Sequence, residues 1–299
     1  MNRLIDESPF EENPVAPVEY DESTTIQFRC HKGVDCWNAC CKQIDITLTP
    51  YDIVRLKNRL GMTSEEFLKK HTVPFEMDRD GLPGVKLRTR DEAPVCLFMD
   101  EETGCTVYED RPTACRYYPV GLLAKRNEKE YVDRTTFVLV EEEHCHGHKE
   151  DARMTIGEYR QQQGVVEYDE LGRGWRQLIL KKMSSGPTIG KPSKTSLNLF
   201  FMACYNHDKF RDFINSESFN KTFDLDQGLL DKLNEDDTEL MLFGFRFLKQ
   251  VLFGEQSIPL HEGAAEQRAR EREEIWRLRQ EAERKLHQAK QEQAEKDSI

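Results

Sequence analysis

The sequence predicts an α+β fold, in which a cysteine-rich N-terminal domain of short strands and helices precedes an α-helical region and a charged C-terminal helix. Eight of the nine cysteines lie between residues 30 and 145, among short alternating segments broken by Gly and Pro. From residue 155 onward, apolar residues recur at three- and four-residue spacing, which is typical of helices. We expect four segments, namely a flexible arm (1–25), the cysteine-rich domain (26–150), the helical region (151–261) and a charged helical or disordered tail (262–299).

The composition limits the partners that the chain could take. A length of 299 residues fits one large domain or two smaller ones. The formal net charge of −12 disfavours duplex DNA and anionic membranes, because a binder of either needs a concentrated cationic face, and no nucleic-acid partner is expected. No run of about 18 apolar residues occurs, so we expect no membrane span. The first residues carry acids and prolines where a signal peptide has an apolar run, and a cytoplasmic location is expected.

Local patterns predict the first elements of the cysteine-rich domain. Apolar and polar residues alternate over 44–48, as in a short strand. Thr49 then supplies a capping hydroxyl and Pro50 suits the first position of a helix. Apolar residues fall on one face of this helix, and Gly61 ends it.

Further elements follow from similar signals. Thr63 and Glu66 form a capping-box pair for a second short helix. Residues 85–88 alternate in polarity and predict a strand, and residues 131–140 are rich in Val, Thr, Tyr and Phe, which strands favour. Residues 96–120 are expected to be loops and short turns.

The C-terminal half is expected to be helical. Thr155 and Glu158 make another capping box, and helical spacing of apolar residues covers 197–215 and 237–253. The aromatic residues of these two stretches are expected to pack in a core; they are Phe200, Phe201, Phe243, Phe245 and Phe247. Segment 262–299 has favourable i,i+4 charge pairs but no sustained heptad seam, which indicates a solvated helix that frays, or alternatively a helix that binds a protein partner.

The density of thiols predicts a metal or redox role. A reducing compartment leaves thiols available, and thiolates bind zinc, iron or iron–sulfur clusters. The spacings match neither a zinc-finger nor a ferredoxin pattern. Adjacent Cys40 and Cys41 could serve one site jointly, or one could bind while the other packs. Cys204, in an apolar helical run, is expected to be a buried apolar residue. The candidate metal ligands are Cys30, Cys36, Cys40, Cys41, Cys96, Cys105, Cys115 and Cys145.

Two blocks of this region resemble the YkgJ-type cysteine-cluster family. The first contains Phe28-x-Cys30, then Cys36-x3-Cys40-Cys41, then Ile-x-Leu-Thr-x2-Asp-Ile-x-Arg-Leu over residues 46–56. The second contains Cys96-Leu-Phe-Met-Asp100, then Gly104-Cys105-x-Val-Tyr-Glu-x-Arg-Pro, then Cys115-Arg-x-Tyr-Pro119. The likeness covers about residues 26–148. Family members often have a shorter gap between the first two cysteines, whereas residues 31–35 separate them here.

The resemblance implies a domain that chelates zinc or iron, with an iron–sulfur cluster as a further possibility. The family is distantly similar to flagellin lysine methylases, which raises an iron–sulfur-dependent protein-modifying enzyme as an alternative function. No Gly-rich methyl-donor loop follows a strand, and no catalytic residue is identified. A second alternative is an interaction scaffold, in which a metal stabilises the N-terminal half and segment 262–299 recruits a partner.

Charged and imidazole side chains near the cysteines have two interpretations each. Arg111 and Arg116 lie close in sequence to Cys115, where a cation would lower a thiol pKa; alternatively they are surface residues or pair with Asp110 and Glu109. Cys145 is favoured as a ligand by a late family cysteine before glycine. Three histidines flank it as secondary candidates or as residues of a polar loop; they are His144, His146 and His148. His31 and His207 are expected to be structural or exposed.

Overall fold

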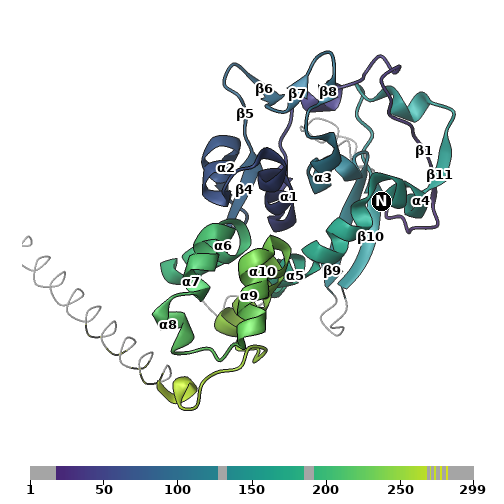
Figure 1. The fold of residues 1–299 in the computed structure, drawn as a ribbon. Helices are drawn as coiled ribbons and strands as arrows, with labels where there is room; N and C mark the ends of the chain where they lie inside the picture. Colours follow the sequence, from purple (N-terminus) through teal and green to yellow (C-terminus); the bar gives the residue numbers. More distant parts are fainter. Residues whose placement is uncertain are drawn as a thin grey trace, which may run out of the picture.

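The computed structural model describes residues 18–126, 133–184 and 192–267, together with the single positions 270, 273, 277 and 281. Short antiparallel strands and small helices make up the N-terminal half, and helices make up the rest (Figure 1), which confirms the α+β class. Residues 1–17 of the expected arm, and most of the charged tail expected at 262–299, lie outside the described residues. Within those described, no helix is both long and apolar enough to cross a membrane.

The strands of the N-terminal half form five small antiparallel sheets of two or three strands. The three-stranded sheet has the order β2-β4-β3, and the other strands form the ribbons β1-β11, β5-β6, β7-β8 and β9-β10. Their bounds are β1 Thr25–Gln27, β2 Thr47–Leu48, β3 Thr72–Glu76, β4 Pro83–Leu87, β5 Thr89–Arg90, β6 Ala93–Cys96, β7 Met99–Asp100, β8 Gly104–Cys105, β9 Val120–Arg126, β10 Asp133–Leu139 and β11 Arg153–Thr155.

The first two helices of the N-terminal half begin at the predicted capping residues, and the first ends at the predicted glycine. The Thr49 hydroxyl accepts a hydrogen bond from the N–H of Asp52, and the Asp52 carboxylate accepts one from the N–H of Thr49, which completes a capping box. Gly61 ends the helix with φ 62°, a left-handed conformation that glycine adopts without strain. A second box, Thr63 with Glu66, opens the next helix. The helices and short 3-10 turns of this half are η1 Ala39–Cys41, α1 Pro50–Leu60, α2 Ser64–His71, η2 Tyr108–Asp110, α3 Thr113–Tyr117 and η3 His146–Lys149.

Some elements depend on partners distant in the sequence, and local patterns did not predict them. Strand β1 pairs with β11, so that Ile26 lies opposite Met154. Residues 96–120, expected to be loops and turns, also contain β7, β8 and the short helix α3. Such elements hold two to five residues, and a helical or strand period cannot be read from one turn or one pair. The strands expected over 85–88 and 131–140 correspond to β4 and β10 and are confirmed.

One large apolar core joins the two halves of the chain. Leu48, Ile53 and Leu56 of the N-terminal half share it with the aromatic residues expected to be core. Of these, Phe200, Phe243, Phe245 and Phe247 are buried, and Phe201 packs against them. A second, smaller core lies among β1, β9, β10 and α4, around Phe28 and Phe137. The helices of the C-terminal half are α4 Ile156–Gln163, α5 Val165–Ser184, α6 Lys194–Tyr205, α7 His207–Ile214, α8 Glu217–Asn220, α9 Gln227–Glu235 and α10 Asp237–Phe253.

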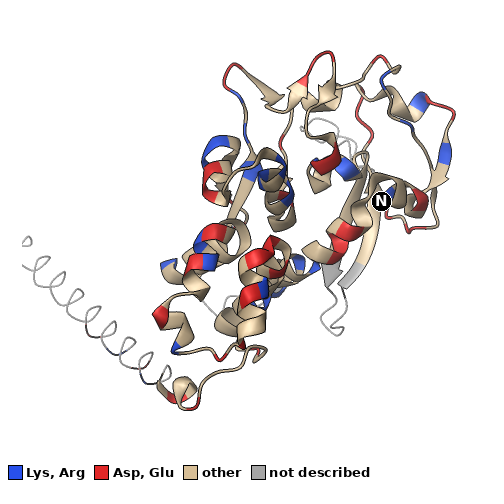
Figure 2. Cartoon of the chain, viewed as in Figure 1, with Lys and Arg blue, Asp and Glu red and all other residues tan. Residues whose placement is uncertain are grey.

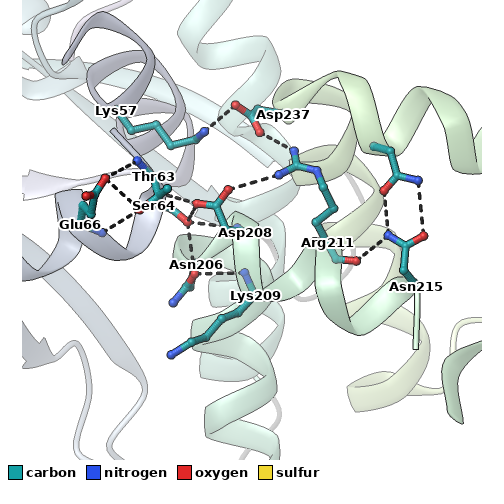
Figure 3. Close-up of polar contacts among 11 residues, drawn as sticks. Lys57, Thr63, Ser64, Glu66, Asn206, Asp208, Lys209, Arg211, Asn215 and Asp237 are labelled. Atoms are coloured by element: carbon teal, nitrogen blue, oxygen red, sulfur yellow. Dashed lines mark hydrogen bonds and ion pairs between the residues drawn. The ribbon is translucent and has the colours of Figure 1, made fainter. Parts of the chain in front are cut away.

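A polar cluster connects the corner between α1 and α2 to helices α7 and α10 (Figure 3). The Ser64 hydroxyl donates to Asp208 at 2.5 Å and to Asn206 at 3.1 Å. Asp237 accepts from Lys57 at 2.6 Å and from Arg211 at 2.5 Å. Lys57 is buried, so its pairing with Asp237 compensates a charge that would otherwise be costly to remove from water. Elsewhere, acidic and basic residues are interspersed along the described helices (Figure 2).

His207, next to this cluster, makes stability depend on pH. Both of its ring nitrogens are buried without a hydrogen-bond partner. Burial lowers the pKa of His207 from 6.5 to about 4, while Asp237 and Asp208 act to raise it and Lys57 and Arg211 act to lower it. Between these two values the unfolded chain binds a proton that the folded chain excludes, so stability is present above pH 6.5 and is lost as the pH falls.

We therefore expect His207→Leu to remove a pH-dependent part of the free energy of unfolding. Between pH 7 and pH 5, the free energy of unfolding of wild type should fall by about 2 kcal/mol more than that of the variant. This difference follows from the pKa values of the unfolded and the folded state and from the free energy that corresponds to one pKa unit. Urea unfolding at both pH values measures this, and comparing two proteins cancels their other titrating groups. A matched control is His261→Gln at an exposed position. Equal pH dependence in wild type and His207→Leu would contradict the assignment.

Asp52 should be a principal stabilising residue of the N-terminal half. Its buried carboxylate caps α1 and also accepts from the N–H and the hydroxyl of Thr113 at 2.8 and 2.7 Å, which ties α1 to α3. Asp52→Ala leaves buried donors unpaired and is expected to cost about 3 kcal/mol of unfolding free energy. Asp52→Asn, which keeps one acceptor oxygen, should cost less. Asp45→Ala, at an exposed ion pair with Lys86, should stay within about 0.5 kcal/mol of wild type in the same denaturation assay.

Candidate metal centre

The clustered cysteines come from five places that the fold brings to one end of the molecule. Strands β5 to β8 lie at the end away from α6 to α10 (Figure 1). All nine cysteines are free thiols. Cys204 is fully buried in α6, as its apolar surroundings predict. The other eight lie in the turn-rich segment 30–41 (Cys30, Cys36, Cys40, Cys41), in β6 (Cys96), in β8 (Cys105), in α3 (Cys115) and just before η3 (Cys145).

Backbone hydrogen bonds bring the start of segment 30–41 to the segment that follows Cys145. The N–H of Arg29 donates to the carbonyl of Gly147 at 3.1 Å, and the N–H of His146 donates to the Cys36 sulfur at 3.2 Å. A Cβ at Gly147 would meet the Phe28 ring at 2.5 Å, so this close approach requires glycine. Partial shielding from solvent, together with charge interactions with Cys40, Cys36 and Cys145, raises the pKa of Cys30 to about 11.

A different set of contacts gathers the cysteines of β6, β8 and α3. Strand β8 pairs with β7, which follows β6 directly, so the chain turns back and brings Cys105 near Cys96. The N–H of Ile44 donates to the carbonyl of Pro94 at 3.0 Å, and this places the end of segment 30–41 beside β6. Burial is the main cause that raises the pKa of Cys96, Cys105 and Cys115. Cys115 also interacts electrostatically with Cys96, Cys40 and Cys105.

Cys40 and Cys41 are in contact but differ in environment. Cys40 is exposed, whereas Cys41 is half-buried against the large core. A hydrogen bond from the Cys41 thiol to the Cys40 sulfur lowers the pKa of Cys40 and raises that of Cys41. Cys41 also interacts electrostatically with Cys96 and Cys115. Within the pair, ionisation is therefore favoured at Cys40 over Cys41.

Cys145 is the other thiol whose ionised form is stabilised. Burial alone would raise its pKa, but hydrogen bonds with His148 and Tyr118 hold the pKa below its ordinary value. The same bond with Cys145 raises the pKa of His148, whose Nε2 lies 3.2 Å from the carbonyl of Val140. From the sequence we expect Tyr118 to line the site without taking part in its chemistry, whereas the structure gives it a hydrogen bond with Cys145.

Arg111 and Arg116 are both buried, so neither is an ordinary surface residue. Arg111 acts to lower the pKa of Cys30 and of Cys105, which agrees with a cation placed near thiols. Its guanidinium donates to the carbonyl of Tyr108 and to the side chain of Gln163, both at 2.7 Å. Arg116 donates to three backbone carbonyls and lies over the Tyr168 ring, so it holds α3 in place.

The remaining histidines of this region have carboxylate partners. His146 lies 2.6 Å from Asp35, His144 lies 3.6 Å from Glu142 and His31 lies 3.0 Å from Glu150. Each imidazole is thus oriented by an acidic side chain. His207 is buried in the helical half, far in sequence from the cysteines, and is structural.

The thiols are neighbours, yet they do not converge on common points. Across residues 18–126, 133–184 and 192–267, no three His, Cys, Asp or Glu side chains are arranged to hold a metal ion. Chelation would therefore require side-chain rotation or movement of the turns that carry the thiols. The donor chemistry fits, because free thiols are ligands for zinc, iron and iron–sulfur clusters. Formation of a metal site during binding is common, since the ligands are rarely fixed without the ion.

A comparison with known protein families finds a match over the region that contains the clustered thiols. Residues 29–151 match the CxxCxxCC family model, whose description is "Putative zinc- or iron-chelating domain". No curated protein and no solved structure matches the chain. The matched region contains all eight clustered cysteines, and the resemblance noted in the sequence is confirmed. Residues 29–151 of this chain are therefore similar to the CxxCxxCC cysteine-cluster family.

Proposed function

We propose that residues 29–151 bind zinc or iron, or an iron–sulfur cluster, through the thiolates of the eight clustered cysteines. The observation that carries this proposal is that eight free thiols from five places in the fold lie at one end of the molecule and interact electrostatically. A structural role for scattered thiols would not require such grouping. Cys204, alone in the helical half, is the counterexample within the same chain.

In this architecture, a bound metal would have a structural role. The region around the thiols consists of two-stranded ribbons and turns, and such ribbons are marginally stable on their own. A metal held by several of these segments would cross-link them, as structural zinc sites do in small domains. We propose that the metal centre stabilises the end of the molecule that these ribbons and turns form.

The first expected outcome concerns metal content. Protein purified without oxygen should contain zinc or iron in stoichiometric amounts, because exposed thiols oxidise in air and then cannot bind. Elemental analysis gives the metal, and absorption near 400 nm distinguishes an iron–sulfur cluster from colourless zinc. Removal of the metal by a chelator should lower the thermal midpoint. Cys204→Ala should keep the full metal content; a metal-free wild-type protein prepared in this way would refute the proposal.

The second expected outcome concerns pH. Cys30, with its pKa raised to about 11, is protonated at neutral pH, as are other thiols whose pKa is raised by burial, including Cys96, Cys105 and Cys115. A metal must displace these protons, so affinity falls as the pH falls, by about tenfold per pH unit for each displaced proton. Competition with a chelator at pH 8 and pH 6 measures this, with the chelator's own protonation corrected. Equal affinity at the two pH values would exclude protonated thiols as ligands.

A further inference from the structure

We propose that the eight thiols form two separate four-sulfur centres rather than one. The first centre comprises Cys30, Cys36, Cys40 and Cys145, and the second comprises Cys41, Cys96, Cys105 and Cys115. Each would take one thiophilic ion or cluster. This inference rests on the proposed function, and it specifies how many metal sites the chain holds and which sulfur belongs to each.

Packing separates the two groups. Cys145 packs against the small core around Phe28 and Phe137. Cys96, Cys41 and Cys105 belong to the large core or pack against it. Cys145 is thus anchored to a different core from Cys41, Cys96 and Cys105, which favours separate centres for these sulfurs.

Hydrogen bonds between segments follow the same division. The first group is tied together by the bond from His146 to the Cys36 sulfur and by the bond from Arg29 to Gly147. In the second group, the bond from Ile44 to Pro94 brings the end of segment 30–41 beside β6. The charge interactions follow this division except at Cys40: Cys30 interacts with Cys36 and Cys145, Cys115 interacts with Cys96 and Cys105, and Cys40 interacts with both groups.

The turn between Cys36 and Cys41 passes from one group to the other. Asn38 has φ 65°, a left-handed conformation that reverses the chain inside this turn. Its side chain donates to the carbonyl of Asp100 at 3.4 Å, which fixes the turn against β7. Cys36 therefore lies with the segment after Cys145, while Cys41 lies against the large core.

We assign Cys41 to the second centre because of its packing, and Cys40 to the first centre because each centre then has four sulfurs. Cys40 interacts with members of both groups, so it lies between them. Cys41 packs on the large core and interacts with Cys96 and Cys115, which completes four sulfurs in the second group. Zinc takes four ligands, and iron–sulfur clusters are commonly held by four cysteines. Cys40 is then the fourth sulfur of the first group. Arg111, which interacts with both Cys30 and Cys105, would offset the negative charge of two thiolate centres.

Paired cysteine variants of the full chain test the division. Zinc and iron are counted per chain after anaerobic purification, and Co²⁺ is titrated into reduced, metal-free protein, where thiolate-to-cobalt absorption counts the thiolate sites. The expected results are two equal steps for wild type and about half of the metal for Cys36→Ser. The double variant C36S/C40S should also keep half, because both changes fall in one centre. The double variant C36S/C41S should keep none, although it differs from the first only by the neighbouring position.

Each alternative gives a distinct result. If one centre holds all eight sulfurs, Cys36→Ser alone loses all metal, or C36S/C40S and C36S/C41S behave alike, and the inference is overturned while metal binding stands. If wild type binds no metal, the proposed function itself fails. Cys204→Ala controls for cysteine loss away from the centres. Near-ultraviolet circular dichroism shows whether the Cys41 variants fold. If they do not, Cys30→Ser, at an exposed position, and C36S/C40S still test the division, because two centres predict half of the wild-type metal content for both variants and a single centre predicts none.

Discussion

The packing of α1 and β4 against α6 and α10 is the constraint on which the rest of the structure depends. Leu48, Ile53 and Leu56 are fully buried in a core that they share with the C-terminal helices. The short ribbons β5-β6 and β7-β8 are anchored to the same core, because Cys96, Phe98 and Met99 are buried in it. The polar cluster of Ser64, Asp208 and Asp237 fixes how the two halves are oriented where they pack, because buried charges and hydroxyls must keep their hydrogen-bond partners.

The position of the thiols follows from that arrangement. Helix α1 is fixed by the core, Asp52 fixes α3 to α1, and α3 carries Cys115. The segment with four cysteines is anchored instead by hydrogen bonds to β6, to β7 and to the chain after Cys145. A helix fixed by the core thus presents Cys115, and a turn-rich segment held by hydrogen bonds presents four of the other sulfurs. Such a combination suits ligands that must adjust to an ion as it binds.

Capping signals and apolar periods in the sequence were sufficient to predict the longer elements. Thr49, Thr63 and Thr155 each open a helix with the expected capping box, and Gly61 ends one. The grouping of the cysteines within one domain was also predictable, from their density and the family likeness. The pairing of β1 with β11 was not, because its energy comes from residues more than a hundred positions apart. A cationic role for Arg111 near a thiol was predictable, but which thiols it affects was not, and the hydrogen bond of Tyr118 with Cys145 was not predictable either, because both depend on which residues the fold brings together.

The unequal solvent exposure of the sulfurs has a practical consequence. Cys30 and Cys40 face the solvent, whereas Cys96 and Cys204 are enclosed. Alkylating reagents and peroxide reach open sulfurs first, and Cys40 is the more reactive of the two because its ionised form is favoured. A mass-spectrometric labelling time course would therefore rank the thiols by access, and protection of Cys40 after loading with an ion would reveal occupancy without any colour or enzymatic assay.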